Sequence, residues 1–528
     1  MLSLRHGSKK HLYTANIILI NANIITLDRV RPKADWVAIA RGKILSLGER
    51  QELVIPGDIE AEIIDYRGRT VLPGFIDSHL HLLSFAESLV TLNLKPKSAV
   101  GSVADIQSRI CNSSRNLPRG NWIRGNGYDE YYLAEKRHPN RWDLDIAALD
   151  HPVKLTHRSG HAHVLNSLAL NFVGIGIETP DPPGGLIERD LNTGLPTGLL
   201  YEMGDFLSAR IPPLDNEDLE KGIKMADQEL ISHGITSICD ASSRNDMERW
   251  NLFKSWKKKG LLNPRVDMML GFEGFEKNNL ESFSTALHPG QLRVSGVKII
   301  LDETTGRLHP SQPELNKMVL EAHQAGRQVA IHAIEEVAIK AACIAIEYAV
   351  KRNPKKDHRH RIEHCSLCPP ALAKRIASLG ITVVTQPPFI YYNAERYLQT
   401  VPEEQLRYLY PLRTLLHHGI NVAGSSDCPI VPPNPLMGMY AAVSRRGETG
   451  DIVGGYEKIP LTEALRMYTQ HAARAMFEEG IKGTITPGKM ADLVVLNGDP
   501  TQLPPDEVKD LKVEMTIVDG QVVWKRGD

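Results

Sequence analysis

The chain lacks any long apolar run, and this absence excludes a membrane-spanning helix. No stretch of about 18 consecutive apolar residues occurs in its 528 residues. The N-terminal stretch MLSLRHGSKKHLYTANIILINANIITLD is basic, but it alternates apolar with polar residues and has no continuous apolar core. We therefore expect no secretory signal. Short-period repeats and low-complexity tracts are also missing.

Cysteine is scarce as well. The six cysteines are scattered along the chain, which is too few for a disulfide framework at this length. Cys365 and Cys368 form a C-x-x-C motif that could hold zinc or serve redox chemistry, but no second pair accompanies it. We interpret the pair as buried structural thiols. The cysteine usage indicates a reducing, cytoplasmic location.

An excess of charge of one sign is also absent. The 62 Lys and Arg residues balance 63 Asp and Glu residues, for a net charge of −1. Nucleic acid and anionic membranes are therefore not expected as partners. A 42% hydrophobic composition is that of a globular protein with one large domain and a smaller one. The expected partner is a small-molecule substrate, and self-association into a homo-oligomer stays open.

What the sequence does contain is a repeated alternation of short apolar strands with helical segments. This pattern predicts an α/β fold, a (β/α)₈ TIM barrel, in which each strand is followed by a helix. The intervening segments, such as PELNKMVLEAHQAG and EVAIKAACIAIEYAVKR, have helical periodicity. The eight strands are predicted at residues 73–82, 234–241, 265–272, 294–302, 328–334, 361–366, 381–388 and 421–427.

Both ends of the chain are rich in short β-type segments separated by turns, such as ADWVAIARGKILSLG and ADLVVLN. We expect residues 1–72 and 480–528 to form one small β-sandwich domain, and residues 73–479 to form the barrel. The excess length lies in an insertion after the first strand, residues 83–233, which is dense in Gly, Pro, Asn and aromatic residues. Long loops of this kind often cap an active site.

The stretch VLPGFIDSHLHL, residues 71–82, places His79 and His81 at the end of the first predicted barrel strand. With 20 histidines in the chain, about one H-x-H pair arises by chance, and the sequence has three. The strand period of two puts His79 and His81 on one face. Their position favours a functional role, because active-site residues of such barrels lie at the C-terminal ends of strands.

Four other predicted strands carry residues able to bind a metal at or near the same end. These residues are Lys298, His332, His364 and Asp427. Each alone has an ordinary structural explanation, but together they supply imidazole and carboxylate, the ligands expected for Zn²⁺ or a similar divalent ion. The sequence therefore predicts a metal site at the barrel mouth.

The other two H-x-H pairs have a different interpretation. His358 and His360 lie in the basic stretch KKDHRHRIEH just before the sixth strand, and we expect them to be solvated at the opposite face of the barrel. His161 and His163 lie in the insertion, in RSGHAHVLNSLAL. They could belong to a polar loop leading into a helix, or His161 could contact substrate.

Taken together, the motifs resemble the metal-dependent amidohydrolase superfamily, and within it the amidohydrolase-3 group that includes the YtcJ-like proteins and N-substituted formamide deformylase. The resemblance implies that His79 and His81 bind a first metal, that His332 and His364 bind a second, and that Asp427 is both a ligand and the catalytic proton carrier. Lys298 matches a lysine that is carboxylated in similar enzymes, giving N6-carboxylysine as a bridge between two ions. The motifs are LPGFIDSHLHL, WIRGNGYDE, HRSGHAHVLNSLAL, DPPGGLIERDLNTGLPTGLLYE, GITSICDA, VAIHAI, RIEHCS, GSSDCPI and KGTITPGKMADLVVLNGDP.

The function expected from this resemblance is hydrolysis of a non-peptide C–N bond, of an amide or of an N-formyl or N-acyl amine, by metal-activated hydroxide. One or two ions, with zinc as the expected metal, both fit the sequence. Substrate contacts in the insertion are expected from Trp122, Tyr128, Asp129 and His161.

Two alternatives stay open. His332-x-x-Glu335 resembles a motif of superfamily deaminases, so the chain could be a one-metal deaminase of a heterocycle with Glu335 as acid and base. A non-catalytic relative that uses the barrel as a scaffold is the other alternative.

Overall fold

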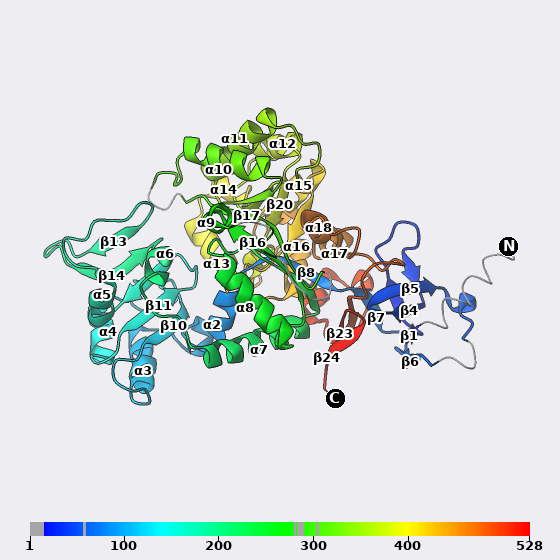
Figure 1. Cartoon of the computed structure of the whole chain (residues 1–528), viewed down its shortest axis with the longest axis horizontal. Helices are drawn as coiled ribbons and strands as arrows, with labels where there is room; N and C mark the ends of the chain where they lie inside the picture. Colours follow the sequence, from blue (N-terminus) through cyan, green and yellow to red (C-terminus); the bar gives the residue numbers. More distant parts are fainter. Residues whose placement is uncertain are drawn as a thin grey trace. The chain divides into compact units, whose positions relative to one another are not determined.

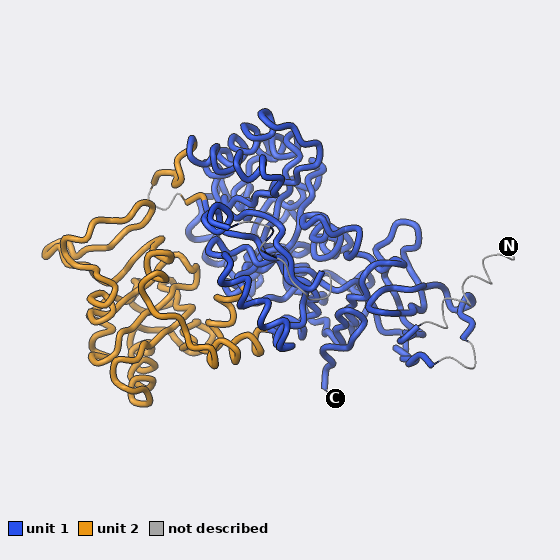
Figure 2. The backbone as a smooth tube through the Cα atoms, in the orientation of Figure 1, with its two compact units in different colours: residues 1–81, 227–300, 313–528 blue, residues 82–226, 301–312 orange. Residues whose placement is uncertain are grey.

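The computed structural model describes residues 15–55, 60–278, 281, 283, 290–302 and 306–527. It contains two compact units, which Figure 2 shows in different colours. Unit 1 comprises residues 1–81, 227–300 and 313–528, and unit 2 comprises residues 82–226 and 301–312. The insertion predicted at 83–233 thus corresponds to most of unit 2.

Unit 1 contains an eight-stranded, all-parallel sheet in the order β21-β20-β19-β18-β17-β16-β15-β8 (Figure 1). Its two outer strands meet through backbone hydrogen bonds from His81 to Cys428 (2.8 Å) and from Asp427 to His79 (2.9 Å). The predicted barrel and its eight strands are confirmed. The strands are β8 (Phe75–Leu80), β15 (Ile235–Asp240), β16 (Arg265–Gly271), β17 (Leu292–Ile300), β18 (Gln328–Ala333), β19 (Arg361–His364), β20 (Thr382–Thr385) and β21 (Val422–Gly424).

Helices follow or precede these strands, as the periodicity predicts. Long amphipathic segments such as α7 and α11 bury one face, because the apolar residues recur every three or four positions. The helices of the barrel include α7 (Asn216–Ser232), α8 (Met247–Lys258), α10 (Gln312–Gln324), α11 (Glu336–Arg352), α12 (Pro370–Ser378), α13 (Pro388–Thr400) and α16 (Pro435–Ser444).

The interior of the barrel is packed on the N-terminal side of the predicted site. One buried residue from each of six strands joins a cluster with Ala472, Ala473, Ala475 and Met476, at helix α18 (Gln470–Ala475). The strand residues are Ile76, Cys239, Met269, Ala330, Val384 and Ala423. Ile76, Ala330 and Ala423 precede the predicted ligands His79, His332 and Asp427 along the chain, so this cluster forms a packed core beneath the site.

The chain ends form two further sheets, in the orders β5-β4-β1-β6 and β24-β23-β22-β7-β2-β3. Apolar residues of both sheets form one buried cluster, which includes Leu19, Val37, Val71, Val495 and Ile517. The domain boundaries at 72/73 and 479/480 stay a prediction. The strands are β1 (Ile17–Ile20), β2 (Asn23–Ile25), β3 (Lys33–Ala34), β4 (Trp36–Ala40), β5 (Lys43–Gly48), β6 (Glu62–Asp65), β7 (Thr70–Pro73), β22 (Leu493–Leu496), β23 (Val513–Val518) and β24 (Gln521–Lys525).

Unit 2 is built on a six-stranded sheet in the order β13-β14-β12-β11-β10-β9, which packs against its own helices around a core of Ile106, Leu144, Leu155 and Val164. The insertion therefore has a fold of its own. Its elements include α2 (Leu82–Leu89), β9 (Leu92–Asn93), α3 (Val103–Ser114), β10 (Ile123–Tyr128), α4 (Arg141–Ala147), β11 (Val153–His157), β12 (Ala162–Leu165), α5 (Ser167–Val173), β13 (Leu186–Arg189) and β14 (Pro196–Tyr201).

The expectation that His358 and His360 are solvated is wrong. Their exposed fractions are 9% and 1%. The His360 ring accepts a hydrogen bond from the Val329 backbone N–H (3.0 Å) and lies 2.8 Å from the His323 ring, while His358 Nε2 lies 2.8 Å from the Leu379 carbonyl oxygen. Backbone groups left open at the N-terminal ends of the strands use these rings as partners, which explains the burial.

In the described ranges, no helix is long and apolar enough to cross a membrane.

Candidate metal centre

Strand β8 carries the two histidines of the opening motif into a buried polar cluster. His79 is fully buried near the end of the strand, and His81 follows the strand by one residue. Asp77 accepts hydrogen bonds from the Ser426 hydroxyl (2.5 Å) and from the Ser426 backbone N–H (3.1 Å). Asp77 thereby holds the loop that follows β21, and this loop presents Asp427.

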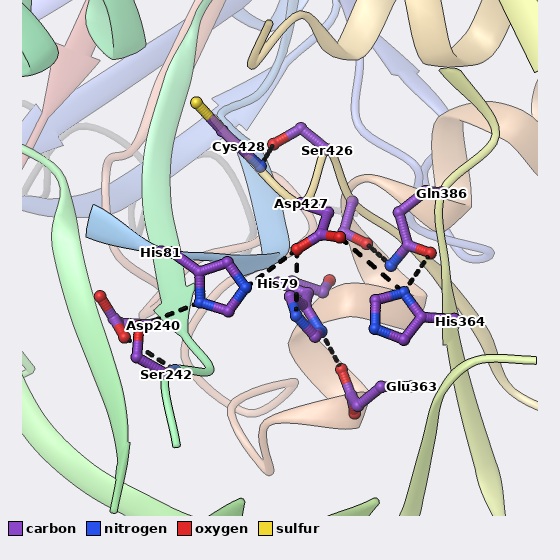
Figure 3. A network of polar contacts seen from close by, with 12 residues as sticks. His79, His81, Asp240, Ser242, Glu363, His364, Gln386, Ser426, Asp427 and Cys428 are labelled. Atoms are coloured by element: carbon purple, nitrogen blue, oxygen red, sulfur yellow. Dashed lines mark hydrogen bonds and ion pairs between the residues drawn. The ribbon is translucent and has the colours of Figure 1, made fainter. Parts of the chain in front are cut away.

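Asp427 lies where three imidazoles converge (Figure 3). Its Oδ1 is 3.0 Å from His81 Nε2 and 3.4 Å from His79 Nε2, and its Oδ2 is 4.0 Å from His364 Nδ1. His332 joins the cluster through a ring contact with His364, with 4.4 Å between ring centroids. The structure thus gathers five of the six predicted ligands through direct contacts.

The sixth predicted ligand, Lys298, lies on β17 beside His332's strand and is 1% exposed. Its charge contributes to lowering the pKa values of His79 and His364, which places it near both rings. Burial lowers the pKa of Lys298 itself to about 8. A buried lysine of this kind has a substantial neutral fraction close to physiological pH.

The histidines are held from behind by hydrogen bonds at Nδ1. His79 Nδ1 pairs with the carboxylate of Glu363, His81 Nδ1 lies 3.0 Å from the Ser242 hydroxyl, and His364 Nδ1 lies 2.9 Å from the amide oxygen of Gln386 (Figure 3). Partners of this type fix the tautomer and the orientation of imidazole ligands in metal sites. For His79 and His81, this leaves Nε2 directed at Asp427.

The protonation states of His79, His364 and Asp427 favour the binding of a cation. Burial lowers the pKa of His79 to about 3 and that of His364 to about 4, so both rings are neutral with a lone pair available. Burial alone would raise the pKa of Asp427, but the close contact with His81 and the neighbouring imidazoles hold it below its usual range. Neutral imidazoles around an ionised carboxylate are the donor set of a divalent metal.

Three buried polar atoms of the cluster, His79 Nε2, Lys298 Nζ and Asp427 Oδ1, make no hydrogen bond. Such atoms are costly to bury and are rarely left in this state in native proteins. A cation bound between them would satisfy the two acceptors. His79, His364 and Asp427 also offer ligand atoms that all lie within 4.8 Å of one another. The residues present therefore fit a divalent metal ion.

Comparisons with known proteins agree with this geometry. A family model described as the amidohydrolase family matches residues 62–524. The chain is 31% identical to N-substituted formamide deformylase of Arthrobacter pascens, over 97% of this chain and 98% of that protein.

The chain is also 29% identical to the putative amidohydrolase YtcJ of Bacillus subtilis (strain 168), over 95% of this chain and 98% of that protein. The solved structure of an uncharacterized metal-dependent hydrolase from Pyrococcus horikoshii OT3 matches with a TM-score of 0.73 and 26% identity, covering 93% of this chain and 99% of that one. The chain belongs to the amidohydrolase family.

The resemblance found in the motifs is thus confirmed, and this amidohydrolase is a hydrolase that acts on carbon–nitrogen bonds. Glu335, which the deaminase alternative requires, is exposed and lies at the start of α11. The carboxylate that lies among the imidazoles of the site is that of Asp427.

The four substrate-contact candidates all lie in unit 2. Trp122 packs edge-on against Phe172 with 5.3 Å between ring centroids, and Tyr128 is fully buried with its hydroxyl 3.0 Å from His138 Nδ1. His161 Nδ1 lies 2.9 Å from the Glu202 carboxylate. These contacts give each residue a role within unit 2, and their part in substrate binding stays a prediction.

Asp129, the fourth candidate, belongs to a second group of ligand-type side chains with Glu130 and His157. His157 Nε2 lies 2.8 Å from Glu130, and Arg158 Nε lies 3.4 Å from Asp129. The positively charged guanidinium already partners one carboxylate of the group. This arrangement is that of a buried ion-pair network.

Several residues of the amidohydrolase site were missed from the sequence, namely Glu363, Gln386, Ser242 and Ser426. Glu363, Ser242 and Gln386 contact predicted ligand histidines, and Ser426 contacts Asp77, so no ligand pattern in the sequence marks them. Glu363 is the clearest case, because a residue next to a ligand in a regular strand is expected on the opposite face.

Proposed function

We propose that this amidohydrolase binds one or two divalent ions, with zinc as the first candidate, and hydrolyses an amide-type C–N bond of a small molecule. N-formyl and N-acyl amines are the substrates to test first. The supporting observation is the buried cluster in which His79 Nε2 and Asp427 Oδ1 lack hydrogen bonds while burial keeps the His79 and His364 rings neutral. The ligands proposed are His79, His81, Lys298, His332, His364 and Asp427. The 31% identity to an N-substituted formamide deformylase supports the substrate class.

A divalent metal bound at this site would supply Lewis acidity toward the scissile carbonyl and a water of lowered pKa. Asp427 is ionised and lies 3.0 Å from His81 Nε2, so it can accept a proton from the attacking water. The same carboxyl group then donates that proton to the nitrogen of the departing amine. An amine is too basic to leave without protonation, so this second transfer is as necessary as the first.

Lys298 is proposed to carry a carboxyl group on Nζ when the site is loaded. Only a neutral amine adds CO₂, and burial lowers the pKa of Lys298 to about 8, so a neutral fraction exists at neutral pH. The resulting carbamate would be an anion that two cations can share. Carbon-13 NMR of protein equilibrated with ¹³C-bicarbonate tests this directly, with Lys298→Met as the control that must lose the signal.

The function itself is tested with zinc-loaded protein and a panel of N-formyl amines, N-acyl amines and cyclic amides, with release of the free amine as the readout. We expect turnover on at least one class and loss of turnover after treatment with a chelator. Full activity in the metal-free protein, or no amine released from any class by the loaded protein, would contradict the proposal.

A Glu335→Gln variant separates amide hydrolysis from the deaminase alternative. Glu335 is exposed at the start of α11, so we expect its loss to change kcat by less than threefold, as in the matched control Glu336→Gln one residue further along. The measurement is steady-state kinetics together with the metal content per chain. A loss of several orders of magnitude in Glu335→Gln alone, with one ion bound, would support the deaminase instead.

A further inference from the structure

Behind the metal site lies a buried chain of charged groups that begins at Arg361. Arg361 donates from Nε to Glu363 Oε1 (2.7 Å) and from Nη2 to Glu363 Oε2 (2.8 Å). Glu363 Oε2 in turn pairs with His79 Nδ1. All three side chains are between 0% and 1% exposed, so these interactions are formed entirely away from water.

Arg361 also spans the barrel interior. Its Nη2 donates to the Ser78 carbonyl oxygen on β8 (2.9 Å), and its Nη1 approaches Cys239 Sγ on β15 (3.6 Å). One guanidinium therefore connects β19 to the strand that carries His79. Burying an arginine and a glutamate is costly, and a purely structural ion pair could be replaced by apolar residues without loss of stability. The cost of burying this pair therefore indicates that the Glu363 carboxylate acts on His79.

The backbone turns at the end of β19, so that two neighbouring side chains reach His79. Glu363 and His364 are adjacent, so a regular strand would point their side chains to opposite faces. His364 has φ +69° and Cys365 has φ +51°, a left-handed conformation that non-glycine residues rarely adopt. As a result, Glu363 and His364 both reach His79, one by a hydrogen bond and the other by a ring contact of 5.0 Å (Figure 3). Strain of this kind is typical of functional sites.

We propose that Glu363, held by Arg361, is a positioning residue that fixes the tautomer and orientation of His79 for metal binding. The carboxylate accepts the proton at His79 Nδ1, which leaves Nε2 as the lone-pair atom beside Asp427 at 3.4 Å. Arg361 holds the carboxylate through two hydrogen bonds (2.7 and 2.8 Å) and so occupies lone pairs that His79 does not use. The inference rests on the metal site proposed above.

The test compares zinc affinity of the wild-type protein and of Glu363→Gln, measured by competition with a chromophoric chelator. The amide keeps the shape of the side chain but removes its charge, and we expect the zinc affinity to fall ten- to a hundredfold, as for other partners of metal-binding histidines. The absorption spectrum of the cobalt(II)-loaded variant should also change, because the ligand field at His79 changes.

Glu457→Gln is the matched control. Glu457 is also a buried glutamate of unit 1, but its partners are the backbone N–H (2.9 Å) and hydroxyl (2.6 Å) of Thr414. We expect this variant to lower the melting temperature of the metal-free protein while zinc affinity and the cobalt spectrum stay as in wild type. Equal zinc affinity in Glu363→Gln and wild type, with only the melting temperature lowered, would overturn the inference and leave a structural role.

Arg361→Lys covers the case in which Glu363→Gln does not fold. Lysine retains the positive charge but cannot donate to both carboxylate oxygens, so an intermediate loss of zinc affinity is expected. Unchanged affinity in Arg361→Lys also counts against the inference. A wild-type protein that binds no zinc overturns the proposed function as well, whereas zinc binding to wild type and Glu363→Gln alike overturns the positioning role alone.

Discussion

Asp427 is held in place through its own backbone and through the residue before it. Its backbone N–H donates to His79 (2.9 Å), its φ is +58°, and the Ser426 residue before it is fixed by Asp77. An aspartate is better tolerated in the left-handed conformation than most residues, because its short side chain can bond locally. The position therefore suits the acid and base role that the chemistry requires.

Asp427→Asn is predicted to lower kcat by roughly a hundred- to ten-thousandfold, because an amide cannot accept the proton of the attacking water. The amide should also weaken metal binding. Steady-state kinetics at saturating zinc, with metal content measured in parallel, separates the two effects. Ser242→Ala, which removes only the partner of His81 Nδ1, serves as the control and should cost far less activity. Activity of Asp427→Asn within threefold of wild type would contradict the assigned role.

The cluster of ligand-type side chains could be predicted from the sequence because strand ends, residue type and a fixed spacing define it. His79 and His364 lie at or near the ends of barrel strands and Asp427 follows one, and the barrel brings such ends together. Glu363 could not be found in this way, because it is adjacent to His364, and the positive φ of His364 is what lets two neighbouring side chains reach one site. No local sequence pattern specifies that conformation at a histidine.

The strands of the barrel were predicted with ends within a few residues of those observed, since each is a short apolar run bounded by turn residues. The sheet of unit 2 was not predicted. Some of its strands contain glycines and charged residues in place of apolar ones, as in Ile123–Tyr128 and Leu186–Arg189, and these lack the alternation of apolar and polar residues that marks a strand. Pairing with neighbouring strands stabilises them in place of local propensity.

Helix α5 (Ser167–Val173) illustrates how unit 2 is held together by single polar residues. Asn166, at its N-cap, is fully buried and uses its whole hydrogen-bonding capacity. Its Oδ1 accepts from the backbone N–H groups of Ala169 and Val153 (3.0 Å each), and its Nδ2 donates to the carbonyl oxygens of Ala148 (3.1 Å) and His151 (2.9 Å). One side chain thereby joins helix α5, strand β11 and the segment after α4.

Asn166→Ala is predicted to destabilise unit 2 by about 2–4 kcal/mol, because it removes a helix cap and leaves buried backbone groups without partners. Hydrogen exchange of the β11 amides measures the local free energy of opening. Asn171→Ala, an exposed change in the same helix, is the control and should stay within about 0.5 kcal/mol of wild type. Similar opening free energies for the two variants would show that the cap is unimportant.

Two buried histidines give the whole protein a dependence on acid. His358 and His360 form a cluster with His323 at the N-terminal side of the barrel strands, in which each ring is paired with a backbone group or with another ring. Burial lowers the pKa of His360 well below its ordinary value, and burial also lowers the pKa of His358. The folded protein therefore resists protonation of His358 and His360.

The direction of the pH effect follows from the difference between the histidine pKa values of the folded and the unfolded chain. An unfolded histidine has a pKa of about 6.5, so below this pH the unfolded chain binds protons that the folded chain does not. Stability is unaffected by these groups above about pH 6.5 and is lost as the pH falls below it, by up to about 1.4 kcal/mol per pH unit for each ring. We predict that the melting temperature of the metal-free protein falls between pH 7.5 and pH 5.

His360→Asn tests the assignment of this effect to the cluster. The Asn amide oxygen can accept the Val329 N–H as His360 Nδ1 does, so the variant should fold, with lower stability at pH 7.5 because the contact with His323 is lost. It can no longer bind a proton, so its melting temperature should fall less steeply with acid than that of wild type. His417→Asn changes an exposed ring and should keep the wild-type slope. If His360→Asn shows the wild-type slope, the acid sensitivity arises from other buried histidines with lowered pKa values, such as His79, His364 and His471.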